Sequence, residues 1–267
     1  MFKDKVIIIT GSTQGIGYKT AEMLAQRGAR LVINSRSQQK VDFALARLRL
    51  AHPNVTGLAG DVSDYHFCRQ LRQLALDTFG QIDILINNAG IASSGLIKDT
   101  LPEAFEKVVD INFLGSLHPT LACVDEICRQ KGSILFIGSV AGILGLPNYS
   151  AYSATKRAIV SLAESLRSEL ADDGVFVGIN YPGFTENDEQ KTIFNANGQE
   201  EILKKRSGVK VVKLEKTVGT IVRQLEKQKF RMYSSYSAEA IQWIYRLFPQ
   251  LTLNLLRHFR HKISSMQ

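Results

Sequence analysis

The sequence has few cysteines and histidines, and it contains no long hydrophobic run. Its three cysteines, Cys68, Cys123 and Cys128, are an odd number without CxxC spacing, which argues against a disulfide framework and a zinc site. The five histidines are scattered and form no ligand or triad pattern, so we expect no metal site. The apolar run near the N-terminus is far shorter than a signal peptide or a membrane span. These absences predict a cytoplasmic protein whose cysteines are reduced packing residues.

Acidic residues are scarce in the C-terminal quarter. Residues 203–267 contain 14 Lys and Arg against 3 Glu, whereas residues 1–202 contain 19 basic and 22 acidic residues. The net charge of +8 therefore resides in the C-terminal quarter. Such a segment attracts an anionic lipid surface, an acidic carrier protein or nucleic acid.

Apolar runs of strand length alternate with helix-compatible stretches. We expect strands at 6–10, 30–34, 54–59, 82–87, 133–139 and 175–181. Runs such as VIIIT and SILFIG are apolar at consecutive positions, which is typical of strands covered by helices on both faces. The pattern predicts a single α/β domain over 1–267, built as one doubly wound parallel sheet (a Rossmann fold).

The chain changes character after the sixth expected strand. The polar segment 183–206 would lie over the carboxyl edge of the sheet, so we expect it to form a substrate loop or lid. A helix over 217–227 and a short strand over 230–233 follow. The last expected feature is an amphipathic helical extension over 237–262, divided at Pro249.

A glycine-rich turn follows the first expected strand directly. The run TGSTQGIG covers 10–17, and helix-compatible residues come after it. Glycines let the backbone approach a pyrophosphate, and the N-terminus of a helix favours its negative charge. The spacing is GxxxGxG, so a plain tight turn is the alternative. The context predicts a dinucleotide phosphate site made by Gly11, Ser12, Gly15, Ile16 and Gly17.

The end of the second expected strand indicates which nicotinamide cofactor is used. NAD-selective sites usually carry an acid there, about 20 residues past the glycines. The sequence instead reads Asn34-Ser35-Arg36-Ser37, and no acid appears before Asp42. A guanidinium can clamp a 2′-phosphate with several hydrogen bonds. Ser35 and Arg36 therefore predict NADPH/NADP+ in preference to NAD, unless Arg36 only solvates a loop.

Tyr152 and Lys156 are four residues apart, so on a helix they share one face. A free phenol has a pKa of about 10, and both a nearby ammonium and an oxidised nicotinamide favour the phenolate. This pair is therefore a candidate general acid/base at neutral pH. The same spacing also occurs in many ordinary surface helices.

Further motifs surround this pair in a fixed order. They are Asp61-Val62 after the third strand, NNAG at 87–90, Asn112, Ser139 at the end of SILFIGS, and Pro182-Gly183 after the sixth strand. With TGxxxGIG and YxxxK, they make the chain resemble the classical short-chain dehydrogenases/reductases over about its first 185 residues. This resemblance implies a Rossmann fold, a nicotinamide cofactor and a homodimer or homotetramer.

The resemblance also implies a role for each motif residue. Tyr152 would give a proton to the carbonyl oxygen, Ser139 would hydrogen-bond that oxygen, Lys156 would hold the nicotinamide ribose, and Asn112 would position a relay water. The alternatives are that Asn88 merely ends a strand and that Asp61 merely begins a helix. The implied cofactor contacts are Asp61, Val62, Asn88, Ala89, Gly90, Tyr152, Lys156, Pro182, Gly183 and Thr185.

One position departs from the family pattern. The family often places a threonine four residues after the glycine of Pro-Gly, and this position is Asn187 here, with Thr185 two residues after the glycine. A hydrolase is a poorer interpretation of Ser139, because its setting FIGSVAG is not GxSxG and no histidine partner is evident.

The C-terminal extension bears on the substrate. Its apolar residues recur at helical spacing among basic ones, so it can lie on an anionic membrane with Trp243 and Tyr245 at headgroup level. Alternatively its apolar face closes the fold or a subunit interface. The membrane interpretation favours a hydrophobic, lipid-like ketone or alcohol. The runs NFLG at 112–115 and HPT at 118–120 resemble the lipid-keto reductases, among them 3-ketosphinganine reductases.

Two other functions share most of these features. A 3-oxoacyl-carrier reductase would use the basic tail to dock an acidic carrier protein. A non-catalytic NADP-binding, membrane-docking module is the second, although Asn112, Ser139, Tyr152 and Lys156 are all present. We do not expect nucleic-acid binding, because the tail has no recognised nucleic-acid motif.

Overall fold

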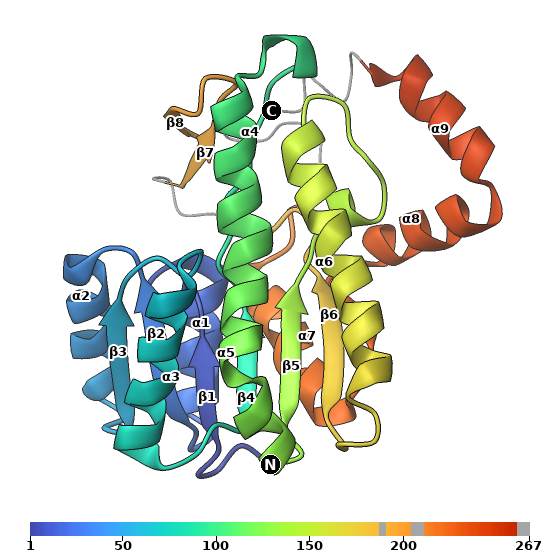
Figure 1. Ribbon diagram of the computed structural model, residues 1–267. Coiled ribbons are helices and arrows are strands. Elements are labelled where there is room, and N and C mark those ends of the chain that lie inside the picture. The colour runs from blue at the N-terminus through green and yellow to red at the C-terminus, as the bar shows by residue number, and fades with distance from the viewer. Residues whose placement is uncertain (187–190, 204–210, 261–267) are drawn as a thin grey trace.

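A seven-stranded parallel sheet organises the protein, whose computed structural model describes residues 1–186, 191–203 and 211–260 (Figure 1). The strand order is β3-β2-β1-β4-β5-β6-β9, and every neighbouring pair is parallel. The predicted doubly wound fold is therefore confirmed. The strands are β1 (Val6–Ile9), β2 (Arg30–Ser35), β3 (Val55–Ala59), β4 (Ile84–Asn87), β5 (Ser133–Ile137), β6 (Phe176–Tyr181) and β9 (Arg231–Tyr233).

Successive side chains of each strand point to opposite faces of the sheet. In β1, Ile7 and Ile9 join one hydrophobic cluster while Ile8 joins the other, and all three are fully buried. This arrangement explains why the strands are apolar at consecutive positions. The strand order reverses between β1 and β4, which creates the switch point where open α/β sheets bind ligands.

The helices cover both faces of the sheet. One face carries α1 (Gly15–Ala25), α2 (Gln38–Arg49) and α7 (Leu214–Lys227). The other carries α3 (Tyr65–Phe79), α5 (Gly115–Arg129) and α6 (Ser150–Glu169). Shorter pieces connect them near the carboxyl edge: η1 (Ile97–Asp99), α4 (Pro102–Val109), η2 (Asp110–Leu114) and η3 (Val140–Gly142).

A β-hairpin occupies part of the segment predicted as a loop over 183–206. Its strands, β7 (Thr192–Phe194) and β8 (Glu200–Ile202), are antiparallel and form a separate two-stranded sheet. Phe194 is fully buried in a small cluster with Val108 and Ala151. The contacts of Phe194 join the hairpin to distant parts of the chain. The polar sequence around the hairpin therefore did not indicate it. Part of the predicted loop is therefore a hairpin, and its role as a substrate loop or lid stays a prediction; residues 187–190 and 204–206 lie outside the described part.

The C-terminal extension forms an elbow of two helices, α8 (Tyr236–Leu247) and α9 (Pro249–His258). Pro249 begins α9, where its missing N–H costs no hydrogen bond. Figure 1 shows α9 standing away from the body of the molecule, and none of its residues is buried. Within the described residues, no helix has the length and apolar character needed to cross a membrane.

Candidate active site

The glycine turn and the loop after β4 are hydrogen-bonded to each other at the switch point. The Thr10 hydroxyl oxygen accepts from the N–H groups of Asn88 and Ala89, each at 3.0 Å. The Asn88 amide donates to the carbonyl oxygens of Thr10 and Gly11, at 2.9 and 2.8 Å. Gly11 has a φ of +59°, and a Cβ there would lie 2.8 Å from Ala89 Cα. Only glycine fits this close approach without strain.

The N-terminus of α1 lies open at this turn. The helix begins at Gly15, and its N-cap residue Gln14 makes no side-chain hydrogen bond to it. The first turn, which includes Ile16 and Gly17, contains no acidic residue. The first N–H groups of a helix have no partner within the helix, so an anion is well placed to accept from them. The turn therefore has the features of a phosphate site.

Ser12 is placed differently from the other predicted phosphate contacts. It is fully buried; its N–H donates to Asn34 O at 2.8 Å and its Oγ donates to Ile9 O at 2.6 Å. Its polar groups therefore stabilise the turn from within. Asn34 extends this network, because its amide donates to the carbonyl oxygens of Leu58 and Gly60 at 3.2 and 3.1 Å. Sequence reasoning passed over Asn34, because an asparagine at a strand end is ordinarily a turn residue.

The residues predicted to contact the adenosine lie at the ends of β2 and β3. Asp61 does not begin α3; its carboxylate accepts from the N–H and hydroxyl of Ser63 at 2.9 and 2.8 Å, while Val62 is buried. Ser35 Oγ accepts from the N–H of Ser37 at 3.2 Å. Arg36 is half-exposed, with Nη2 3.8 Å from Glu200 Oε1 on β8. The sequence did not indicate that the hairpin reaches this arginine.

Asn112 lies in η2, a single π-helical turn between α4 and α5. Such turns are rare and often occur at functional sites. Asn112 is fully buried, and its Oδ1 accepts from Ile91 N at 2.7 Å. Its Nδ2 donates to Ile91 O at 3.0 Å and to Thr155 Oγ1 at 3.1 Å. The side chain therefore joins the loop after β4 to α6, and sequence reasoning had missed Thr155.

Lys156 and Tyr152 share one face of α6, as predicted. Lys156 Nζ lies 5.8 Å from the centroid of the Tyr152 ring and donates to Ile137 O at 2.9 Å. Burial, together with the nearby charge of Lys191, lowers the pKa of Lys156 to about 8. A Cβ added to Gly90 would lie 3.0 Å from Asn112 Oδ1 and 3.4 Å from Lys156 Nζ. Asn112, Lys156 and Gly90 therefore converge beside Tyr152.

Ser139 follows β5 on the same edge of the sheet. It is the N-cap of η3, and its Oγ accepts from Ala141 N at 3.2 Å. This hydrogen bond uses the oxygen as acceptor, so the hydroxyl proton remains available for another acceptor. The Ser139 hydroxyl thus caps the short helix that follows β5 at the carboxyl edge of the sheet.

The segment after β6 is secured by β9 and α7. Gly183 N–H donates to Ser234 Oγ at 2.7 Å, next to the buried Pro182. Thr185 Oγ1 donates to Gly183 O at 3.1 Å and lies 3.0 Å from Thr217 Oγ1. The Thr185 hydroxyl is therefore engaged within the protein. Asn187, the position that departs from the family pattern, lies outside the described residues.

The cysteines take no part in this site. All three are free thiols, and burial raises the pKa of Cys68 and of Cys123 to about 12. A thiol with so high a pKa is unreactive at neutral pH. In the described part of the chain, no three His, Cys, Asp or Glu side chains are grouped as a metal site requires.

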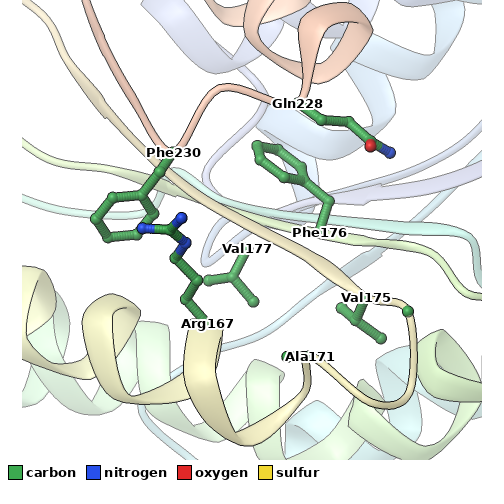
Figure 2. A pocket seen from close by; sticks show the side chains of 8 residues that line it. Arg167, Ala171, Val175, Phe176, Val177, Gln228 and Phe230 are labelled. Atoms are coloured by element: carbon green, nitrogen blue, oxygen red, sulfur yellow. The ribbon is translucent and has the colours of Figure 1, made fainter.

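A hollow of about 260 Å³ lies at the opposite, amino end of β6 (Figure 2). Figure 2 shows the Arg167 guanidinium beside the Phe230 ring, and the two are 4.8 Å apart. The remaining lining is mostly aliphatic or aromatic, and no carboxylate or nucleophile is among it. This hollow is therefore separate from the residues predicted to carry the chemistry.

Comparison with known proteins decides the family. The model of the short chain dehydrogenases matches residues 5–198, which is most of the chain. The protein belongs to the short-chain dehydrogenase family. It is therefore an oxidoreductase of this type. A relative from Pinus massoniana, named 11-beta-hydroxysteroid dehydrogenase, is 31% identical over 96% of this chain and 75% of its own length.

Two solved structures share the fold. A short-chain dehydrogenase/reductase from Burkholderia phymatum in complex with NAD has a TM-score of 0.82, with 24% identity over 94% of this chain and 96% of its own. An alcohol dehydrogenase from Thermococcus sibiricus complexed with 5-hydroxy-NADP has a TM-score of 0.73, with 24% identity over 86% and 95% of the two chains. At this level of identity the similarity establishes the fold alone.

Proposed function

We propose that this family member is an NADPH-preferring oxidoreductase that transfers hydride between the nicotinamide and a carbonyl or secondary alcohol carbon of a hydrophobic molecule. The convergence of Asn112 and Lys156 on Gly90 beside Tyr152 carries the proposal. Buried ionisable and polar groups with specific partners at a ligand-binding edge are characteristic of catalytic sites.

The residues present fit a nicotinamide dinucleotide. The open N-terminus of α1 suits a pyrophosphate, and the absence of a side chain at Gly90 leaves the approach to Lys156 free. When bound, the nicotinamide supplies or accepts the hydride. The preference for NADPH over NADH rests on Arg36. The residues that would hold the cofactor are Gly11, Gly15, Ile16, Gly17, Ser35, Arg36, Asp61, Val62, Asn88, Ala89, Gly90, Tyr152, Lys156, Pro182, Gly183 and Thr185, with Ser12 supporting the turn.

The proton chemistry belongs to three side chains. In the reducing direction the Tyr152 hydroxyl gives its proton to the carbonyl oxygen, and the Ser139 hydroxyl donates a hydrogen bond to the same oxygen. The Lys156 cation stabilises the phenolate that remains. Asn112 holds the loop after β4 at a set distance from α6, so that these groups and the relay water keep their places.

The elbow favours a hydrophobic substrate. An apolar hollow of about 200 Å³ lies between Leu144, five residues after Ser139, and the helices α8 and α9. Its walls include Ile241, Leu255 and Phe259. A relative is named for a hydroxysteroid, which is itself a hydrophobic alcohol. We therefore propose lipid-like ketones or alcohols, 3-keto long-chain bases among them, as substrates.

The same elbow suits a peripheral membrane contact of a cytoplasmic protein. Trp243 is 53% exposed and Phe248 57% exposed, and Arg246 and Arg257 lie on the same two helices. Exposed apolar side chains with interspersed cations fit an anionic lipid surface.

We also propose a homodimer or homotetramer assembled through α5 and α6, because α5 exposes an apolar side chain, Leu121.

One experiment separates these proposals from their alternatives. Purified protein is mixed with NADPH or NADH and with short diketones, steroid ketones, 3-keto long-chain bases or 3-oxoacyl thioesters, and the loss of reduced nicotinamide is followed by absorbance. Turnover that prefers NADPH and rises with chain length supports the proposal. Turnover confined to carrier-bound 3-oxoacyl thioesters would favour the carrier reductase, and NADPH binding without any turnover would favour a non-catalytic module.

A further inference from the structure

The β7–β8 hairpin brings an acid to the place where the cofactors NAD and NADP differ. We infer that Glu200 is a specificity-determining residue that opposes Arg36: its carboxylate competes with a 2′-phosphate for the guanidinium and accepts a hydrogen bond from a ribose 2′-hydroxyl. Glu200 thereby shifts nucleotide preference toward NAD(H). This inference rests on the proposed use of a nicotinamide dinucleotide.

The hairpin is anchored firmly enough to hold Glu200 in place. Phe194, the register partner of Glu200, is fully buried and exchanges backbone hydrogen bonds with the loop after β4, donating to Ala92 O at 2.9 Å and accepting from Ser94 N at 2.8 Å. Leu101 N adds a third bond of 2.9 Å, to Ala196 O in the hairpin turn. The hairpin lies at the carboxyl edge of the sheet beside α4 (Figure 1). Glu200 is thus presented by a fixed support.

Arg36 and Glu200 occupy unusual relative positions. In NAD-selective sites the acid ordinarily stands at the end of the second strand. Here Arg36 stands at that end, and the acid comes from a distant part of the chain, with Oε1 3.8 Å from Arg36 Nη2. One point of the structure therefore combines a clamp for a 2′-phosphate with an acceptor for a 2′-hydroxyl.

The strengths of the interactions decide the direction of the effect. Both partners of the ion pair are about half exposed, and exposed pairs of this kind are weak. A 2′-phosphate, which a guanidinium binds with two hydrogen bonds, therefore displaces Glu200 from Arg36. Because the hairpin is anchored, the carboxylate stays close and repels the phosphate. Unit charges about 6 Å apart change a binding constant by roughly threefold in water and by up to about a hundredfold near a protein surface.

The test measures nucleotide binding, so it does not depend on finding a substrate. Dissociation constants for NADP+, NAD+ and 2′,5′-ADP are determined by calorimetry for the wild type, for Glu200→Gln and for Glu200→Asp. Glu201→Gln is the matched control, because Glu201 is the exposed neighbour on β8 and accepts from Asn195 Nδ2 instead. We expect Glu200→Gln to tighten binding of NADP+ and 2′,5′-ADP by roughly three- to hundredfold without tightening binding of NAD+. Glu200→Asp and Glu201→Gln should behave as the wild type.

The outcomes are distinguishable. If the wild type binds both dinucleotides and Glu200→Gln leaves their ratio unchanged or weakens NADP+, this inference is wrong and the proposed function stands. If Glu201→Gln has the same effect as Glu200→Gln, a general charge effect replaces the specific one and the inference is again wrong. If the wild type binds neither dinucleotide, both the proposed function and this inference are wrong.

Discussion

Two regions of the molecule invert the usual distribution of side chains in opposite ways. Around η2 and α6, polar groups are buried: Asn112 is fully buried and Lys156 is 5% exposed. On the α8–α9 elbow, apolar groups are exposed, with Leu247 64% and Leu251 54% accessible. Soluble proteins generally bury apolar side chains and leave charged ones in water.

The comparison shows that the two inversions are stabilised differently. Every polar atom of Asn112 and the Lys156 ammonium has a hydrogen-bond partner within the protein, which offsets the cost of burial. The apolar side chains of the elbow are exposed among the described residues, and exposed apolar patches of this kind are typical of interaction sites. The polar groups of the first region are satisfied within the protein, whereas the second region is the one for which we propose a partner.

Removing the Tyr152 hydroxyl tests the buried region most strongly. Tyr152→Phe should lower kcat/KM by about 10²- to 10⁴-fold, because the proton donor is lost while packing is preserved. Binding of NADPH and the thermal unfolding temperature should change little. Tyr65→Phe is the control, since the Tyr65 ring is 44% exposed at the start of α3 and packs edge-on against His118. Retention of most activity in Tyr152→Phe would contradict the assigned role.

Removing the Asn112 amide tests whether the buried polar network is complete. Asn112→Ala leaves the N–H and C=O of Ile91 without their partner, so the free energy of unfolding should fall by about 2–4 kcal/mol. Urea unfolding gives this value, with the exposed Asn54→Ala as the control. A loss equal to that of the control would mean that the network contributes nothing to stability.

Making the elbow polar tests whether it needs a partner. Phe248→Ser with Leu251→Ser should weaken binding to vesicles of phosphatidylcholine and phosphatidylserine by roughly 10- to 100-fold, because two partly buried apolar side chains are lost. Phe43→Ser with Leu50→Ser is the control, since these residues are of the same two types and even more exposed but lie on α2 and at its end. Loss of self-association without any vesicle binding would instead show that the elbow is a subunit interface.

The titration of Lys156 gives the smallest effect. Burial lowers its pKa from 10.5 to about 8, so between these values the unfolded chain binds more protons than the folded one. The free energy of unfolding of the wild type, relative to Lys156→Met, should therefore rise by about 1–2 kcal/mol from pH 8 to pH 9.5. The exposed Lys98→Met serves as the control. A difference that is flat or falls with pH would contradict the burial of a protonated Lys156.

Local patterns were sufficient to predict the positions of the six main strands along the chain and the doubly wound fold. The consecutive apolar runs predicted strands within two residues of their observed ends, because burial on both faces leaves a direct trace in composition. The helical spacing of Tyr152 and Lys156 placed them on one face. The hairpin was not predicted, because its stability comes from Phe194 packing between distant segments.

The sequence by itself determined the Rossmann fold, the family and the shared face of Tyr152 and Lys156, since each depends on residues that are near one another along the chain. Only the tertiary structure decided that Asn112 meets Thr155 and Gly90, that Glu200 faces Arg36, and that the apolar side of α9 remains exposed. These features depend on contacts between distant segments. Hydrophobic periodicity shows which face of an element is buried, but it does not show which distant residue that face contacts.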